Sequence, residues 1–403
     1  MAVATATYQE MTDDQQAIVE MVRSFVDNEI LPNATEFDHE DKFPEAIVEQ
    51  MKELGLFGVT IPEEYGGMGL DLATYTLIVE ELSRGWISIS GVVNTHFIGS
   101  YLLMKFGTDE QKDYFLPKMA TGEIRAAFSL SEPEVGSDVQ GIKSTAKLDD
   151  DGKWVIDGQK MWVTNGLGSG VVFVLVKTDT KADPPYKGMT CFITEKEPWT
   201  EKNEGDFAGL EVPPKIKKMG YKGVESTELI YSGYKCPPER ILGGKDGIGE
   251  GFRQMMDALE VGRVNVAARG VGIAQRALEL ALRYAQERKT FGKPIAEHQA
   301  IQFKLAEMAT KVEAARLLTR KAARMKDAGE RSDLEAGMAK LFASETGKEV
   351  VEESFRIHGG YGYSKEYEIE RLYRDAPLLL IGEGTSEIQK MVIGKKVLQR
   401  NKI

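Results

Sequence analysis

Residues 143–164 read KSTAKLDDDGKWVIDGQKMWVT, and this stretch decides the fold class. Two short runs with the composition of strands flank Asp149-Asp-Asp-Gly152, which is a typical signal for a hairpin turn. With their neighbours they make seven such runs, at residues 125–130, 143–148, 154–156, 160–164, 171–177, 189–194 and 227–231. Because no helical pattern separates these runs, the sequence predicts an antiparallel barrel or sandwich. It argues against a Rossmann sheet, which needs alternating strands and helices.

Helical patterns occupy the chain on both sides of this β-rich region. Thr12 and Gln15 form a capping box, and Thr108 and Gln111 open a short helix that we expect to end near Pro117. Further helices are expected at residues 45–54, 72–84, 88–105, 252–289, 297–328, 333–357 and 386–399. The predicted fold class is α+β multidomain. It comprises an N-terminal α-helical domain (1–125), a middle antiparallel β-barrel or sandwich domain (126–245) and a C-terminal four-helix-bundle domain (246–403).

The composition argues against several classes of protein. The chain has 403 residues and a formal net charge of −12, which disfavours a nucleic-acid surface and an anionic membrane. Two cysteines and four histidines, without the spacing of metal ligands, predict neither a disulfide framework nor a metal site. The N-terminus does not resemble a signal peptide, and no apolar run reaches membrane-spanning length. We therefore expect a cytoplasmic protein without stable membrane insertion.

One carboxylate stands out in residues 373–389, YRDAPLLLIGEGTSEIQ. Glu383 lies between two glycines, after an apolar run and before Ser386 and Gln389, which have the spacing of a capping box. A carboxylate that faces an apolar pocket loses hydration, so its pKa rises and it becomes a stronger base. The same residues also fit a surface turn that leads into a helix. This stretch alone leaves both interpretations open.

Other segments combine glycines with polar or aromatic groups. Trp162 and Thr164 share one face of an alternating strand, and a flat ring beside a hydroxyl suits a planar heteroaromatic cofactor; core packing is the alternative for Trp162. Arg288 begins a basic turn that fits either a charged helix end or a phosphate contact. Residues 356–360, RIHGG, offer bare backbone amides to an anion. The glycine-rich residues 243–251 lack the spacing of a nucleotide loop and fit an interdomain connection.

The order of these segments resembles the acyl-CoA dehydrogenase flavoprotein family. The resemblance covers residues 12–398, and its most specific motifs are residues 131–138, 159–166, 287–292, 357–362 and 373–389. It implies an enzyme that removes the α-proton of an acyl-CoA thioester and passes the β-hydride to N5 of FAD, giving the trans-2-enoyl-CoA. It also implies electron-transfer flavoprotein as the electron acceptor and a homotetramer built as a dimer of dimers.

The resemblance implies a role for each matched residue. Glu383 matches the catalytic base, and its backbone N–H is implied to bind the thioester carbonyl together with a ribityl hydroxyl of FAD. Isovaleryl-type relatives place the base at the position of Gly262, so Glu383 keeps that role here. Residues matched to substrate contacts are Ser137, Glu260, Arg263 and Gly384. Residues matched to FAD contacts are Phe128, Leu130, Ser131, Gly136, Ser137, Trp162, Thr164, Arg288, Thr290, Phe291, His298, Gln299, Arg356, Ile357, Gly359, Gly360, Thr385 and Glu387.

Part of the FAD site is implied to come from a second subunit. Arg288, Gln299 and residues 356–360 match residues that reach the adenosine diphosphate half of the flavin from the neighbouring chain. A monomer is therefore expected to be inactive.

Four departures from the family pattern bear on specificity. Arg356 stands where many relatives have Gln, and Glu134 replaces a common Gly. Gly382 replaces a common Tyr, which favours bulky, branched or medium-length acyl groups. Ser90 stands where glutaryl-type enzymes carry an arginine for a distal carboxylate, which argues against a dicarboxylyl substrate. Two alternative functions remain: an acyl-CoA oxidase, although such enzymes usually have an extra C-terminal domain, and a non-catalytic flavin or acyl-CoA binding protein.

Overall fold

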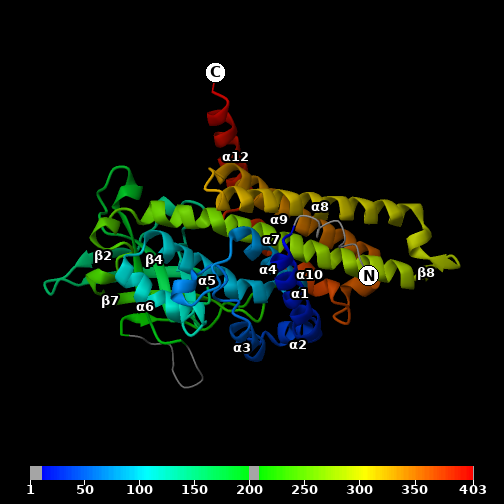
Figure 1. Cartoon of the computed structure of the whole chain (residues 1–403), viewed down its shortest axis with the longest axis horizontal. Helices are drawn as coiled ribbons and strands as arrows, with labels where there is room; N and C mark the ends of the chain where they lie inside the picture. Colours follow the sequence, from blue (N-terminus) through cyan, green and yellow to red (C-terminus); the bar gives the residue numbers. More distant parts are fainter. Residues whose placement is uncertain (1–10, 199–207, 403) are drawn as a thin grey trace.

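A sheet and three long helices set the long axis of the molecule (Figure 1). The computed structural model describes residues 11–198 and 208–402. The sheet lies at one end, and α7 (Gly251–Glu287), α8 (Gln299–Asp327) and α9 (Asp333–His358) run along the axis towards the other end. The N-terminal helices pack against both parts. The predicted α+β class, with its order of helical, β and helical segments, is confirmed.

The N-terminal segment is helical, as its apolar periodicity predicts. Its elements are α1 (Asp13–Phe25), the π-helical turn η2 (Val26–Ile30), α2 (Leu31–Glu40), α3 (Glu45–Glu53), η3 (Glu63–Tyr65), α4 (Leu72–Gly85), α5 (Ile87–Phe106) and α6 (Asp109–Ala120). The capping boxes predicted at Thr12 and Thr108 both form. The prediction that α6 ends near Pro117 is wrong. The helix continues to Ala120 because burial of Met119 in the core stabilises its last turn.

The middle segment forms one seven-stranded sheet with the order β1-β4-β2-β3-β7-β6, and β5 pairs with β4. Its strands are β1 (Ala126–Ser129), β2 (Thr145–Leu148), β3 (Trp154–Thr164), β4 (Val171–Lys177), β5 (Met189–Glu195), β6 (Leu210–Glu211) and β7 (Ser226–Cys236). The prediction of a wholly antiparallel sheet is wrong, because β4 pairs in parallel with β1 and, at one position, with β2. The runs predicted at residues 154–156 and 160–164 belong to one strand, β3, and β6 was not predicted.

Strand β4 is buried on both faces, which is typical of a central strand with parallel neighbours. Phe173 and Leu175 pack into the large core shared with the helices, whereas Val172 and Val174 belong to the smaller core on the other side of the sheet. Helix α5 lies against the first face. A Cβ at Gly99 of α5 would lie 2.8 Å from Cε2 of Phe173, so the glycine allows the helix to approach the sheet.

The apolar character of α5 reflects its position in the core. By length and composition α5 would suffice to cross a membrane, but 89% of its apolar window is buried inside the protein. The statement that no apolar run reaches membrane-spanning length is therefore wrong for α5. In this fold the helix is covered by the sheet and by α7.

The C-terminal segment is helical as predicted, but its last helix does not complete the bundle. Helices α7, α8 and α9 pack on one another, and α4 packs against α7 and α8. The remaining elements are β8 (Lys289–Thr290), β9 (Lys293–Pro294), α10 (Ile369–Asp375), α11 (Pro377–Ile381) and α12 (Ser386–Arg400). Helix α12 packs on α9 and points away from the long axis (Figure 1). The fourth helix beside α7, α8 and α9 is thus α4.

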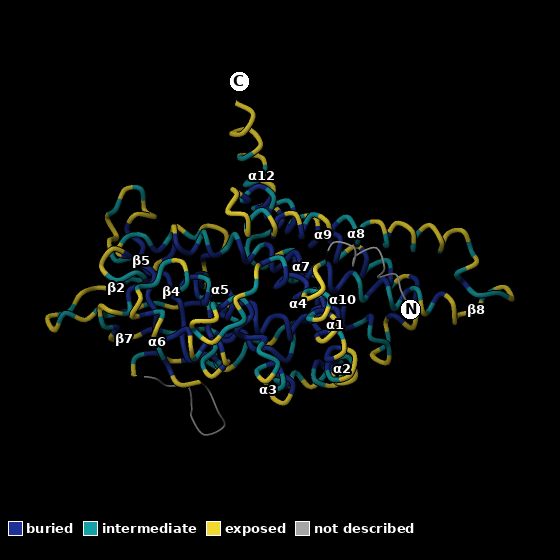
Figure 2. Tube along the Cα trace, in the orientation of Figure 1, coloured by how far each residue is buried: buried dark blue, intermediate teal, exposed yellow. Residues whose placement is uncertain are grey.

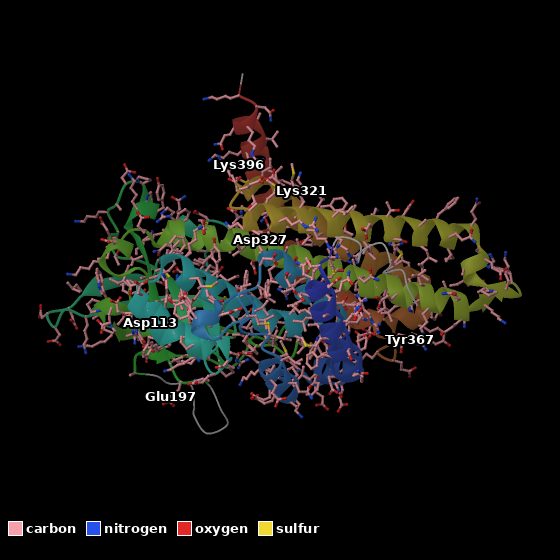
Figure 3. All side chains as sticks on the ribbon, viewed as in Figure 1. Asp113, Glu197, Lys321, Asp327, Tyr367 and Lys396 are labelled. Carbon is pink, nitrogen blue, oxygen red and sulfur yellow. The ribbon has the colours of Figure 1, made fainter. Side chains whose placement is uncertain are left out.

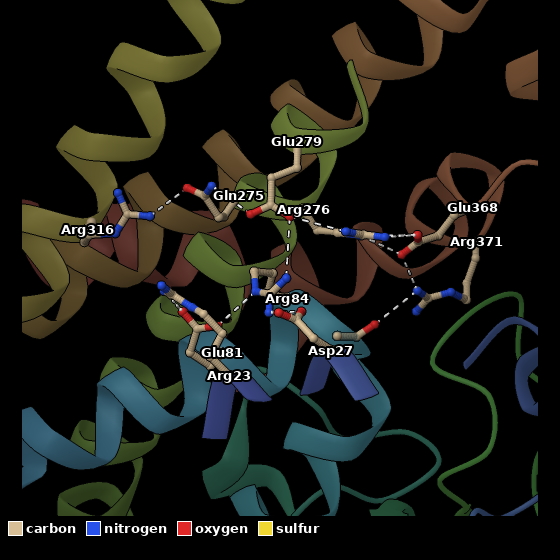
Figure 4. Close-up of polar contacts among 11 residues, drawn as sticks. Arg23, Asp27, Glu81, Arg84, Gln275, Arg276, Glu279, Arg316, Glu368 and Arg371 are labelled. Carbon is tan, nitrogen blue, oxygen red and sulfur yellow. Dashed lines mark hydrogen bonds and ion pairs between the residues drawn. The ribbon is translucent and has the colours of Figure 1, made fainter. Parts of the chain in front are cut away.

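Ion pairs of a buried arginine link the helices of the two helical segments (Figure 4). Arg84 of α4 is 7% exposed and contacts Asp27 at 2.6 Å and Glu279 of α7 at 3.6 Å. Removing one partner of a buried ion pair is strongly destabilising, because it leaves the other charge uncompensated. The network therefore holds α4 and α7 in one relative position.

The ends of α4 and α8 are also joined. Figure 2 shows α4 and much of α7 as buried, whereas α8 and the outer half of α12 are more exposed. The carboxylate of Asp327 (labelled in Figure 3) accepts hydrogen bonds from the backbone N–H groups of Leu72 and Ala73, both at 2.8 Å. The end of α8 thus caps the start of α4.

Candidate active site

Glu383 lies in a turn of unusual backbone geometry between α11 and α12. Its φ angle is +54°, in the left-handed region that non-glycine residues seldom adopt, and Gly384 follows with φ +93°. Such a conformation costs about 1–3 kcal/mol and persists only where the surroundings impose it. Trp162 and Phe291, which the sequence also singled out, have positive φ angles too. Strained backbone therefore coincides with three of the predicted site positions.

The carboxylate of Glu383 is buried, so the surface-turn interpretation is wrong. Oε1 accepts a hydrogen bond from Nδ2 of Asn94 at 2.6 Å, and Oε2 is buried without a hydrogen-bond partner among the described residues. Burial raises the pKa of Glu383, while the hydrogen bond from Asn94 and the charges of Arg269, Lys340 and Arg263 oppose that rise. A buried carboxylate with one free oxygen is suited to accept a proton.

Gly262 of α7 adjoins this carboxylate. A Cβ at Gly262 would lie 2.2 Å from Oε2 of Glu383 and 3.1 Å from Cδ1 of Ile98. The missing side chain therefore leaves the volume that the carboxylate occupies. Positions 262 and 383 were both considered for a base. A side chain at either position occupies the same volume.

Two polar side chains beside Glu383 were not singled out from the sequence. Asn94 comes from α5, and Lys340, from α9, is fully buried, with Nζ donating to the carbonyl of Gly384 at 2.8 Å. Burial lowers the pKa of Lys340 to about 8. Nε2 of Gln389 donates to the same carbonyl at 3.2 Å. Asn94 and Lys340 lie 289 and 44 residues from their partners, so no local pattern links them.

Helix α12 begins at Ser386, as predicted, but its N-cap differs from the prediction by one residue. Thr385, not Ser386, is the N-cap, and its side chain accepts a backbone N–H of the first turn at 3.3 Å. The predicted capping box at Ser386 is wrong, because Oγ of Ser386 instead donates to Oε1 of Glu345 at 2.6 Å. Thr385 and Glu387 lie next to the turn that contains Glu383.

The two charged residues matched to substrate contacts differ in their partners. Oε1 of Glu260 accepts hydrogen bonds from Ser332 at 2.9 Å and from Lys326 at 3.1 Å, so this carboxylate joins α7 to the ends of α8 and α9. Nε of Arg263 is buried without a partner among the described residues. Burial lowers the pKa of Arg263, and the charges of Glu260 and Glu383 oppose the change. Arg263 thus retains a free donor whose charge acts on Glu383.

Strand β3 presents Trp162 at the surface. Its side chain is 57% exposed, so the core-packing alternative is wrong. Its φ of +64° falls at a register shift between Lys160 and Val163. The strict alternation that placed Trp162 and Thr164 on one face is interrupted there, as at a β-bulge.

The residue after Thr164 joins β3 to the helix that contacts Glu383. Nδ2 of Asn165 donates to the carbonyl of Val92 and to Oγ1 of Thr95, both at 2.8 Å. The adjacent residue of α5, Asn94, contacts Glu383. One turn of α5 therefore connects the end of β3 to the candidate base.

The loop after β1 is fixed by a buried ion pair. Nζ of Lys160 is 2.9 Å from Oε1 of Glu132 and 3.1 Å from the carbonyl of Leu130. The backbone N–H of Met161 donates to the carbonyl of Ser131 at 2.9 Å. Residues matched to FAD at this end of the molecule thus lie on neighbouring segments. Phe128 is on β1, and Gly136 and Ser137 are exposed in the loop.

A second group of predicted residues surrounds a cavity of about 570 Å³ at the other end of the molecule. The turn after α7 and the segment after α9 converge there, and Arg288, Thr290, Ile357, Gly359 and Gly360 are among its lining residues. Four others lie nearby without lining it: Phe291 is 96% exposed, His298 contacts Thr290, Gln299 begins α8, and Arg356 pairs with Glu352.

One chain does not bring the two groups together. Gly262, beside the candidate base, lies within α7, and Arg288 directly follows the end of that helix. They are separated by 26 residues, which corresponds to about 39 Å along the helix axis. In Figure 1 the sheet and the β8 hairpin lie at opposite ends of the molecule. Within one chain, the two groups of predicted residues therefore do not form one continuous site.

Among the described residues, one group has the composition of a metal site: Asp38, His39 and Glu370. Nε2 of His39 lies 2.7 Å from Oε1 of Glu370, and Arg374 contacts Asp38 at 2.5 Å and Glu370 at 2.8 Å. The guanidinium already compensates both carboxylates, so this group is an ion-pair network between α2 and α10.

Comparison with known proteins identifies the family. Models of the acyl-CoA dehydrogenase N-terminal, middle and C-terminal domains match residues 12–123, 127–233 and 249–398. A 3-(aryl)acrylate reductase from Clostridium sporogenes is 42% identical over 394 residues, which cover 96% of this chain and 99% of that protein.

Solved structures agree over the whole fold. Butyryl-CoA dehydrogenase from Megasphaera elsdenii is 36% identical with a TM-score of 0.90, covering 96% of this chain and 99% of that one. An acyl-CoA dehydrogenase from Bacillus anthracis, complexed with FAD, is 34% identical with a TM-score of 0.89, covering 98% and 68%. The three consecutive domains and the similarity along nearly the full chain show that this protein belongs to the acyl-CoA dehydrogenase family of oxidoreductases.

Proposed function

We propose that the protein catalyses the FAD-dependent α,β-dehydrogenation of an acyl-CoA thioester to the trans-2-enoyl-CoA, with Glu383 as the base. The observation that carries this proposal is the buried carboxylate of Glu383. One oxygen is held by Asn94, the other has no partner among the described residues, and burial raises the pKa of the group. Such a carboxylate is poised to take the α-proton.

Proton removal from a thioester also needs a donor for the carbonyl oxygen, where negative charge develops. Within the described part of the chain, the backbone N–H of Glu383 has no hydrogen-bond acceptor. It is therefore available to the thioester carbonyl. Lys340 and Gln389 hold the next carbonyl, that of Gly384, and so fix the turn that supplies both the base and this donor.

The residues near both ends of the molecule fit FAD. The exposed ring of Trp162, the hydroxyl of Thr164 and the backbone of residues 130–137 suit the isoalloxazine and ribityl groups. Bound FAD supplies the acceptor for the β-hydride at N5. Arg288 suits the diphosphate, and the Cβ positions of Gly359 and Gly360 face open space, so the backbone there is accessible to an anion.

The site is proposed to be completed by a second copy of the chain. The two groups of FAD residues lie too far apart in one chain to hold the same cofactor. Phe291, 96% exposed at the β8 hairpin, supplies apolar surface for such a contact. A homotetramer built as a dimer of dimers, electron-transfer flavoprotein as the electron acceptor and a cytoplasmic location belong to the same proposal.

The test is anaerobic bleaching of the bound flavin by a panel of straight, branched and dicarboxylyl acyl-CoA thioesters. We expect at least one thioester to reduce the flavin, and Glu383→Gln to slow that reduction about 10³-fold while retaining FAD. A flavin that none of the panel bleaches would contradict the proposed reaction. Near-normal reduction in Glu383→Gln would move the base elsewhere, and hydrogen peroxide formed in proportion to turnover in air would indicate an oxidase.

A further inference from the structure

A buried arginine lies near Glu383 without a carboxylate of its own. Arg269 of α7 is 4% exposed. Its Nε donates to Oγ of Ser90 at 3.2 Å, one terminal nitrogen donates to the carbonyl of Ile87 at 3.3 Å, and the guanidinium carbon lies 4.9 Å from the ring centroid of Tyr221. All three partners are neutral. A buried cation without a negative partner is unfavourable unless some other group compensates it.

Three other arginines that are buried to a similar degree pair with carboxylates. Arg84, Arg316 and Arg371 are 7%, 7% and 1% exposed. Each contacts a carboxylate at 2.9 Å or less. Arg269 makes no ion pair within 4.0 Å among the residues the structure describes. Its environment is thus distinct from that of a structural ion-pair arginine in the same protein.

The register of α7 places Arg269 beyond the base on the same helix face. It follows Gly262, which adjoins the carboxylate of Glu383, by seven residues, which is two turns or about 10 Å of helix. Helical side chains point back towards the N-terminus, so the long side chain of Arg269 shortens this separation. Its charge acts on Glu383, Tyr75 and Tyr221, lowering the pKa of each against the effect of burial.

One residue between these two points on the helix face is also polar, as is a nearby residue of α5. Asn265 is fully buried, its Nδ2 donates to the hydroxyl of Tyr75 at 2.9 Å, and its Oδ1 has no partner within the described ranges. Oδ1 of Asn94, beside Glu383, is likewise buried and unpaired. An acyl chain that is alkyl throughout leaves such groups unsatisfied, which is costly in a buried site.

From this arrangement we infer that the protein selects short acyl-CoA thioesters with an anionic group, a carboxylate, at the distal end of the acyl chain, and that Arg269 binds that group. The inference rests on the proposed function, because it takes the volume beside Glu383 as the acyl site. A distal carboxylate gives Arg269 the negative partner that it lacks. It also holds the α-carbon at Glu383 from the far end of the chain.

The expectation against a dicarboxylyl substrate rested on Ser90, which stands where glutaryl-type enzymes carry an arginine for the distal carboxylate. In the structure Arg269 reaches Ser90 from α7 and donates to its hydroxyl. A guanidinium is therefore present at that point, although it comes from another helix. The basis for that expectation is removed.

The test compares two ligands of the same shape and different charge: glutaryl-CoA and its uncharged monoamide. Calorimetric titration into the FAD-loaded Glu383→Gln variant measures binding without turnover. We expect glutaryl-CoA to bind at least about 10-fold more tightly than the monoamide. Arg269→Gln in the same background is expected to abolish this preference, and Arg269→Lys to retain part of it. Arg283→Gln, which removes a charge from an exposed position of α7, is the matched control and keeps the preference.

Equal affinity for the two ligands in the Glu383→Gln variant would overturn the inference. So would equal weakening of both by Arg269→Gln, because Arg269 would then only support the pocket. A failure of the proposed reaction can be distinguished from a failure of this inference. If no thioester bleaches the flavin of the wild-type protein, that reaction is wrong, while the binding preference still decides the role of Arg269.

Discussion

At Glu383 the structure balances two electrostatic effects on one side chain. Burial raises the pKa of its carboxyl group, whereas Asn94 and the cations Arg269, Lys340 and Arg263 lower it. In the proposed reaction, this balance sets the pH at which Glu383 can accept a proton. It also makes the ionised carboxylate a cost to the folded state, since the unfolded chain hydrates it fully.

Replacing Lys340 is expected to move the pH dependence of the reaction. Lys340→Met removes a cation that lowers the pKa of Glu383, so the acidic limb of the kcat/KM profile should shift to higher pH. Flavin reduction measured between about pH 5 and pH 9 tests this. Lys348→Met, which removes a lysine of the same helix that pairs with Glu352, should leave the limb in place. An unchanged profile in Lys340→Met would show that its charge does not reach the base.

The stability of the protein should depend on Glu383 with a defined sign. Because its folded-state pKa is raised, its ionisation opposes folding above the unfolded pKa of about 4.3. Glu383→Gln should therefore raise Tm at pH 7, and the difference should vanish below about pH 4.

Glu335 should show the opposite sign of change in Tm, and scanning calorimetry measures Tm for both variants. Its hydrogen bond with Arg400 lowers its pKa, so its stabilising effect is present above the unfolded pKa and is lost as pH falls. Glu335→Gln should lower Tm at pH 7. Two variants that change Tm in the same direction would contradict this assignment of signs.

Helix α7 is the element that organises the candidate site, because it contacts the sheet, Glu383 and the neighbouring helices in turn. Two of its glycines, Gly262 and Gly270, differ in what an added Cβ would contact. At Gly262 a Cβ would meet the flexible carboxylate of Glu383, at 2.2 Å, whereas at Gly270 it would meet the backbone carbonyl of Ala343, at 2.6 Å. The first glycine leaves room for chemistry and the second for helix packing.

This difference predicts separable effects of the same substitution. Gly262→Ala should fold with a Tm close to that of the wild type but reduce the flavin about 10²-fold more slowly, because the carboxylate is displaced. Gly270→Ala should lower Tm, since backbone cannot move aside as a side chain can. Thermal unfolding and single-turnover reduction of both variants make the comparison. Normal reduction in Gly262→Ala would show that the carboxylate has another productive position.

Features of the fold that depend on neighbouring residues could be predicted from the sequence, whereas contacts between distant residues could not. Caps at Thr12 and Thr108 and the apolar run of β4 depend on nearby residues, so their structures were predictable. The parallel pairing of β4 was not, because it depends on strands far apart in sequence. Glu383 emerged from a motif, but Asn94 and Lys340 did not, because only the packing of α5 and α9 brings them to it. The exposure of Trp162 depends on a bulge in β3 that the sequence of the strand does not predict.

At the scale of the whole molecule, the separation of the two predicted FAD groups supports the proposal that a second chain completes the active site. It predicts that two inactive variants complement each other. Glu383→Gln lacks the base, and Arg288→Glu repels the diphosphate; a mixed dimer then contains one intact site, with Glu383 from one chain and Arg288 from the other.

Co-refolding equal amounts of the two variants should restore about a quarter of the wild-type activity, since half of the dimers are mixed and each has one intact site. Each variant refolded alone is the control. Activity no greater than the sum of the separate variants would show that both groups serve one chain. Size-exclusion chromatography with light scattering establishes that mixed oligomers formed.

Helix α12 joins the turn that carries Glu383 to an exposed apolar surface. It begins at Ser386, three residues after Glu383, and ion pairs of Lys396 with Asp333 and Arg400 with Glu335 fasten its outer half to the start of α9. Met391 and Leu398 nevertheless remain 69% and 75% exposed. A neighbour that covers them also holds the helix from which the catalytic turn extends. In the proposed oligomer, docking of a partner on α12 therefore also constrains the turn that carries Glu383.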